Sequence, residues 1–158
     1  MNYPLQSMLK IRVMREDRAG TALTSARRAR KVAADELEMR RRERAAYLET
    51  KDERRDRIYE QVMGRAVGMD VLDDVRTAVT RIDEEGVLFE RAEQEAEAAL
   101  MKKEREAESA RIEFVGASRN RMKIDEHRKI WVDEMRLEEE RAVDAEMDEF
   151  TGKKRNEE

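Results

Sequence analysis

The chain has 158 residues; 46% of them are Asp, Glu, Lys or Arg, 4% are aromatic, one is proline and none is cysteine. A composition poor in Pro and Gly and rich in good helix formers is typical of long helices or coiled coils and argues against an ordinary globular domain. The lack of cysteine excludes a disulfide framework and thiolate chemistry. No window approaches the roughly 20 apolar residues of a membrane span or the apolar core of a secretory signal, so we expect a cytoplasmic protein that does not insert into membranes.

The net charge of −4 is unevenly distributed along the chain. Residues 1–63 carry 16 basic and 11 acidic side chains, a net +5, whereas residues 70–158 carry 17 and 27, a net −10. Opposite signs on the two halves favour two helices that lie side by side. An autonomous nucleic-acid binder would instead need a dominant basic face, so we expect no nucleic-acid partner.

A first helix is predicted over residues 4–63. Pro4 suits the first turn of a helix, where its missing N–H would have no partner. From Leu5 to Ile58, a stripe of apolar and small residues, with some charged ones, recurs at spacings of three and four and includes Arg12, Arg30 and Tyr47. A period near 3.5 sustained over many turns predicts a coiled coil, and the alternative is a solvated single helix held by ion pairs within it.

The stretch QVMGRAVGMDVL, residues 61–72, interrupts this pattern with two of the chain's six glycines. We interpret residues 64–69 as the turn of a hairpin. Gly64 is expected to end the first helix with positive φ, and Asp70 is the candidate N-cap of the second. A second stripe from Val75 to Ala142 predicts helix two over residues 70–150, followed by a disordered tail at 151–158.

The expected fold is therefore all-α, a single antiparallel two-helix coiled-coil hairpin over residues 1–158. If the chain reverses near residue 66–67, the numbers of facing residues total about 133, which pairs Leu37 with Ala96. Leu48 falls near Gly86 and is expected to cover the gap there. Trp131 is expected to close the open end against Tyr3, and the second helix then continues alone as an acidic overhang.

The sequence offers little for catalysis or for a cofactor. Two paired helices provide no concave, water-excluding site. Gly152 and the two lysines after it lack the spacing of a phosphate loop, and a single histidine, His127, rules out a His-paired metal site. The basic run at residues 40–44 is interpreted as a solvated or cross-helix pairing face. We expect no enzyme, no cofactor and no metal.

Two features favour contacts with other proteins. Trp131 lies on the second stripe, which makes a core position its simplest interpretation, yet tryptophans are also good interface anchors. At the turn, two helices cannot bury every apolar side chain, and exposed apolar residues at an end mark a contact site. The residues of this tip are Met63, Val67, Met69 and Leu72. Simple closure of the loop is the alternative for the tip.

Residues at both ends resemble the YscO (SctO) family of type III secretion proteins, the injectisome counterparts of flagellar FliJ. At the N-terminal end the likeness rests on Tyr3-Pro4-Leu5, Leu9-x-Ile11-Arg12, Arg15 and Arg18-Ala19. At the other end it rests on His127, Trp131, Glu134, Glu138-Glu139 and the run from Glu146 to Glu149. Between these ends the chain is similar to the family only in being helical.

The resemblance implies a non-enzymatic central stalk that couples a hexameric secretion ATPase to the export gate protein, at the cytosolic base of a bacterial inner-membrane apparatus. Family members also bind secretion chaperones, and such a stalk is expected to be a monomer when isolated. The end with both termini would enter the ATPase pore and the hairpin tip would face the gate. The pore end would then carry Tyr3, Leu5, Leu9, Arg12, Arg15, Arg18, Trp131 and Glu134.

Two other classes of protein remain open at this point. One is a free-standing coiled-coil chaperone or adaptor that grips partners with its tips, which would need a separate multimerising element. The other is an RNA-binding coiled-coil arm, whose binding would depend steeply on salt.

Overall fold

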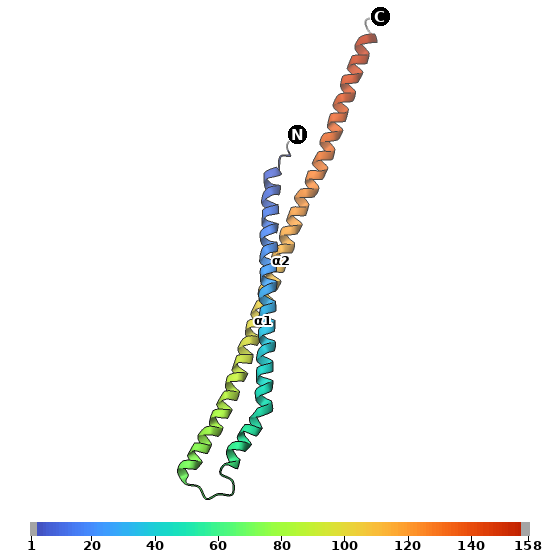
Figure 1. The fold of residues 1–158 in the computed structure, drawn as a ribbon. Helices are drawn as coiled ribbons and strands as arrows, with labels where there is room; N and C mark the ends of the chain where they lie inside the picture. The colour runs from blue at the N-terminus through green and yellow to red at the C-terminus, as the bar shows by residue number, and fades with distance from the viewer. Residues whose placement is uncertain (1–2, 156–158) are drawn as a thin grey trace. The chain divides into compact units, whose positions relative to one another are not determined.

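The computed structural model describes residues 3–155, with side chains described for residues 3–147. Two helices, α1 (Gln6–Glu60) and α2 (Met69–Arg155), account for the described secondary structure, which contains no strand (Figure 1). The all-α, two-helix fold with a longer second helix is therefore confirmed. Neither helix, over the described residues, has the length and hydropathy that a membrane span requires.

The ends of the helices differ from the predicted ends by one to five residues. α1 begins at Gln6 and ends at Glu60, inside the predicted 4–63, because the chain at 61–64 forms turns. α2 begins at Met69 and continues to Arg155, five residues past the predicted end at 150. Of the predicted tail at 151–158, residues 156–158 lie outside the described part of the chain.

The chain divides into two compact units, each with one segment from each helix. The terminal unit contains residues 1–23 and 110–158, and so pairs the start of α1 with the later part of α2. The hairpin unit contains residues 24–109, with the rest of α1, the connecting turn and the start of α2. We describe each unit by itself.

The predicted register holds inside both units. In the hairpin unit, Lys51 forms an ion pair with Asp83, and the two numbers total 134. In the terminal unit, the ring of Phe114 lies 3.4 Å from the position that a Cβ on Gly20 would occupy, again a total of 134. These two contacts agree with the expected total near 133, while longer side chains also reach residues about one turn further along, as Arg54 does to Glu85 with a total of 139.

The turn between the helices uses glycine in two ways. Gly64 has a φ of 72°, the left-handed conformation predicted for it, and follows a last helical bond from Met63 N–H to the Tyr59 carbonyl of 2.9 Å. The N-cap prediction for Asp70 is wrong. The Leu72 N–H donates to the Gly68 carbonyl at 3.3 Å, so Gly68 is the N-cap and Asp70 lies in the first turn, where its charge still favours the helix dipole.

The core of the hairpin unit matches large residues with small ones across the two helices. Leu37, Ile82 and Ala96 are buried, and Leu37 and Ala96 are a predicted facing pair. The prediction that Leu48 covers Gly86 is wrong, since Leu48 is 52% exposed. Tyr47 covers it instead, with its Cε1 atom 3.1 Å from where a Cβ on Gly86 would be. Tyr47 is itself a stripe position, and glycine leaves room for its ring.

Candidate protein-binding surfaces

An aromatic cluster closes the open end of the terminal unit. Tyr3 is only 6% exposed, and its ring centroid lies 5.5 Å from that of Trp131 and 5.9 Å from that of His127. The Tyr3 hydroxyl and His127 Nδ1 are hydrogen-bonded at 2.9 Å. The expected closure by Trp131 against Tyr3 is confirmed. The contact with His127 was not predicted, although its position one turn before Trp131 gave a signal for it.

The predicted pore-end residues divide into packing residues and surface residues. Tyr3 and Leu9 are buried between the helices, so they shape this end rather than present area to a partner. The half-buried members are Leu5, Arg12 and Trp131. The exposed members are Arg15, Arg18 and Glu134. The terminal unit therefore offers a partner the edge of one aromatic ring and three guanidinium groups.

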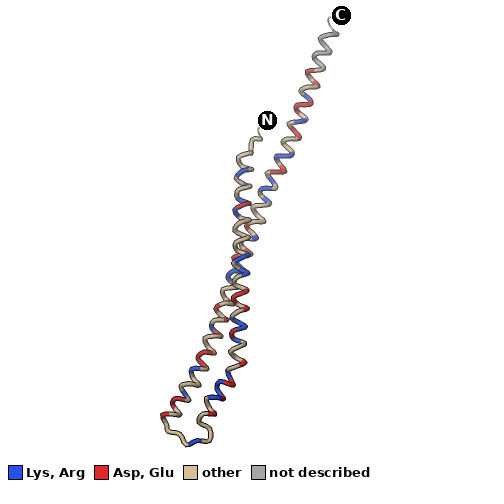
Figure 2. The backbone as a smooth tube through the Cα atoms, in the orientation of Figure 1, with Lys and Arg blue, Asp and Glu red and all other residues tan. Residues whose placement is uncertain are grey.

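In the hairpin unit, basic residues of α1 are paired with acidic residues of α2. Arg44 and Glu93 lie 2.9 Å apart, and Glu93 also receives a hydrogen bond from Arg41 at 3.3 Å. Nearer the turn, Arg54 donates to Glu85 at 2.8 Å. The prediction that the basic run at 40–44 forms a cross-helix pairing face is confirmed for Arg41 and Arg44. Figure 2 shows the basic positions of α1 and the acidic positions of α2 in this unit.

These ion pairs lower the pKa values of their carboxyl groups. The hydrogen bond from Arg44 holds the pKa of Glu93 below its ordinary value of 4.5, and the Lys51 ammonium lowers the pKa of Asp83 in the same way. The hydrogen bond from Arg54 lowers the pKa of Glu85. A carboxyl group whose pKa is lower in the folded state binds protons more readily when unfolded, so it stabilises the fold above its unfolded pKa.

The hairpin unit should therefore lose stability in acid. As the pH falls from about 5 through the lowered pKa values of Glu93, Glu85 and Asp83, their contribution is lost progressively. Thermal unfolding followed by circular dichroism across this range should show a falling midpoint. A triple variant with Glu93→Gln, Glu85→Gln and Asp83→Asn should show a smaller fall, and an unchanged pH slope would contradict the assignment. Added salt should weaken the effect because the pairs are partly exposed.

The arginines of the terminal unit contrast with those of the hairpin unit. One cross-helix ion pair joins Arg121 to Glu16. Within the described residues, Arg12, Arg15 and Arg18 have no carboxylate partner. Their positive charge is thus not neutralised by direct pairing and is available to carboxylates of another molecule.

The hairpin tip presents the apolar side chains that the sequence predicts. Met63 is 73% exposed and Met69 75% exposed, while Leu72 is exposed and Val67 half-buried. Closing the loop therefore does not bury the two methionines. Exposed methionine is flexible and polarizable, which suits an adaptable protein contact.

Beyond residue 133, the register leaves α2 with no position of α1 to face. The side chains of residues 132–147 are exposed except for Met135, and they include apolar Leu137, Val143 and Met147. The expected overhang is confirmed over these residues. Among the described residues, no group of His, Asp and Glu side chains is arranged to hold a metal ion.

Comparison with known proteins comes from a family profile and from a solved structure. The profile of the YscO-like protein family matches residues 1–153. A solved structure of a YscO homolog, CT670 from Chlamydia trachomatis, is similar to this chain with a TM-score of 0.76 and 22% identity. The similarity covers 95% of this chain and 92% of that one, and at this identity it shows a shared fold. No curated protein matches the chain.

Proposed function

Because the chain belongs to the YscO-like family of type III secretion-associated proteins, we propose that it is the central stalk coupling the secretion ATPase to the export gate. The family is a structural component of secretion, and the proposal assigns no catalytic role to the chain. Its place would be at the cytosolic base of the apparatus, with escort chaperones as further partners.

The observation that carries the proposal is the chemical contrast between the terminal unit and the tip of the hairpin unit. The terminal unit has an aromatic edge at Trp131 and, further along α1, arginines without an ion-pair partner among the described residues, which suits a ring lined with polar and acidic groups. The tip has exposed methionines and little charge, which suits a mostly apolar pocket. Two chemically different ends favour a protein that joins two different partners.

A stalk also needs surfaces that exchange contacts readily. Exposed ion pairs contribute about 0–1 kcal/mol each, so a charged helix pair can move against a ring without strong trapping at any position. The side chains of α2 at residues 136–147 are exposed and largely charged, which fits such a sliding contact.

The experiment is a pull-down with the cognate secretion ATPase and, separately, with the cytosolic domain of the export gate. Trp131→Ala should weaken capture of the ATPase and leave capture of the gate unchanged. A tip variant with Met63→Ser and Met69→Ser should do the reverse. Trp131→Phe, which keeps a ring against Tyr3, is the control for loss of local folding.

Failure of the wild-type chain to bind or stimulate the ATPase would overturn the proposal. A chain that instead assembled into stable oligomers and held unfolded clients would favour a free-standing chaperone or adaptor.

A further inference from the structure

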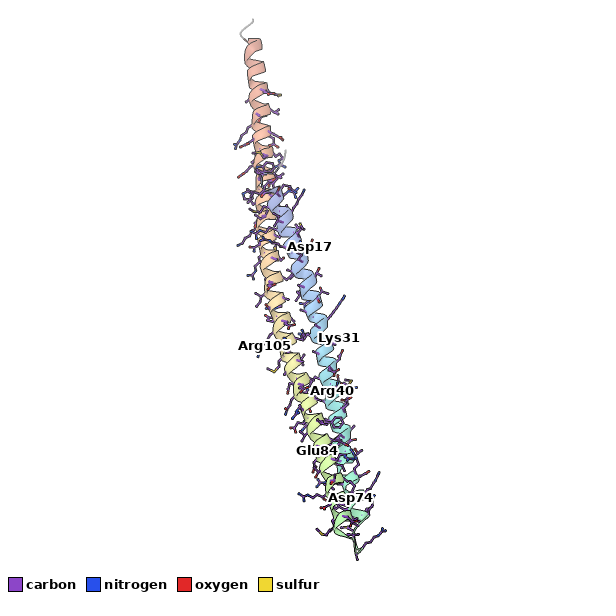
Figure 3. All side chains as sticks on the ribbon, turned by 90° about the vertical axis from the view of Figure 1, so that its left-hand side faces the viewer. Asp17, Lys31, Arg40, Asp74, Glu84 and Arg105 are labelled. Atoms are coloured by element: carbon purple, nitrogen blue, oxygen red, sulfur yellow. The ribbon has the colours of Figure 1, made fainter. Side chains whose placement is uncertain are left out.

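A second basic surface lies on α1 in the hairpin unit, and neither the stalk proposal nor the pairing pattern accounts for it. It is formed by Arg27, Arg28, Arg30 and Lys31, and we call it the basic face. All four side chains are exposed. Figure 3 labels Lys31 on α1 and shows where the basic face lies in this unit.

The sequence around the basic face lacks the acidic residues with which other arginines of α1 form ion pairs. Residues 18–34 contain five basic and no acidic side chains. In a helix, partners for an ion pair stand three or four residues away. Arg40 has Glu36 and Glu43 at these spacings and pairs with both. Arg27, Arg28 and Arg30 have no acidic residue at either spacing.

The opposite helix does not neutralise the basic face either. Within the described residues, none of its four side chains forms an ion pair, although the register places Glu104 across from Arg30. Lys31, with Asp35 four residues ahead, is likewise unpaired. Arg30 is also a stripe position that remains exposed instead of packing on α2. Four positive charges thus lie within little more than one helical turn without a direct counter-charge.

We propose that the basic face is a docking site for an acidic segment of a partner protein, formed by other residues than the aromatic cluster and the tip. Arg27 and Lys31 stand one turn apart, about 6 Å between neighbours on a helix surface, which matches glutamates four apart on an acidic helix. Guanidinium groups bind carboxylates in a bidentate manner, which gives such a contact directionality.

The surroundings favour an acidic polypeptide over a nucleic acid. No aromatic side chain occurs in residues 18–34 on which a base could stack. The four charges of the basic face span little more than one helical turn, an extent that a short acidic segment can match.

The test uses the full chain and a fluorescent poly-L-glutamate peptide, with binding followed by anisotropy at low ionic strength. The variant R27Q/R28Q/R30Q/K31Q removes the basic face without losing helix propensity. The control R91Q/R105Q/R119Q/K129Q removes the same net charge from exposed positions of α2 that have no ion pair in the described structure. Circular dichroism of both variants checks that the fold is kept.

We expect the first variant to bind the peptide about tenfold more weakly than wild type, since it loses four charged contacts, and the control to change less than about twofold. A carbodiimide cross-link to the peptide should map to Lys31. Equal losses in both variants, no binding by wild type, or cross-links mainly at other lysines would overturn the proposal. Tighter binding of a single-stranded oligonucleotide of equal charge would assign the basic face to nucleic acid and also overturn it.

Discussion

Replacing Tyr47 with alanine should lower the free energy of unfolding of the hairpin unit by about 3–5 kcal/mol, the usual range for truncating a buried aromatic residue. Tyr47 is 6% exposed, its ring lies 4.9 Å from that of Phe89, and it fills the space beside Gly86. Its hydroxyl donates a hydrogen bond to the Ile82 carbonyl. Alanine would remove these contacts at once and leave a cavity between two helices that have few other large buried side chains.

Two controls separate the contributions of the ring and the hydroxyl. Tyr47→Phe keeps the ring and loses the hydrogen bond, so it should cost about 1 kcal/mol. Leu48→Ala alters the exposed neighbour and should change stability by less than about 0.5 kcal/mol. A loss below about 1 kcal/mol for Tyr47→Ala would contradict the role given to the ring.

Urea unfolding followed by two probes measures the effect. Circular dichroism reports the helices of both units, whereas the fluorescence of Trp131, the single tryptophan, reports the terminal unit. If Tyr47→Ala shifts the circular dichroism transition more than the fluorescence transition, the two units unfold separately. Coincident shifts would show that they unfold as one cooperative unit.

The sequence predicted those parts of the fold that follow from periodicity and from one chain reversal. A stripe of period near 3.5 favours helices that pair, and a glycine with positive φ at Gly64 sets where the chain turns. Once the turn is placed, the register is fixed along both helices. For this reason the pairing of residues as far apart as Tyr3 and Trp131 was predicted from the position of the turn.

The errors lie where several neighbouring side chains compete for one place. Leu48 and Tyr47 both stand near Gly86, and only the geometry of the helix surfaces decides that the aromatic ring enters. At the start of α2, Asp70 has the better side chain for an N-cap, but Gly68 holds the position two residues earlier, since α2 begins at Met69. Such choices involve shifts of one or two residues, which a repeating pattern does not specify.

The candidate surfaces were predicted less completely than the fold. Sequence alone located the apolar tip and the aromatic end, but it did not separate buried Tyr3 and Leu9 from exposed Arg15 and Arg18. Nor did it distinguish arginines that find a carboxylate from those that do not. That distinction requires the register and the local spacing together, and it is the basis of both binding surfaces proposed on α1.

Reversing the charge of Arg12, Arg15 and Arg18 to glutamate should abolish stimulation of the secretion ATPase and weaken its binding by about 100-fold, because like charges brought together in an interface cost several kcal/mol. The wild-type guanidinium groups have no partner inside the described chain, so binding carboxylates of the ring would break no existing ion pair. Binding of the wild type should also weaken as salt is added.

Arg12 is half-buried on the stripe, so its reversal also disturbs helix packing. The double variant R15E/R18E changes only exposed side chains and should still lose most of the stimulation. R76E/R91E/R105E, which reverses three exposed arginines of α2 in the hairpin unit, carries the same net charge as the triple variant and should retain the stimulation. If R15E/R18E stimulated the ATPase as well as wild type, the arginines would not be its contact residues, and the aromatic edge at Trp131 would have to account for binding at this end.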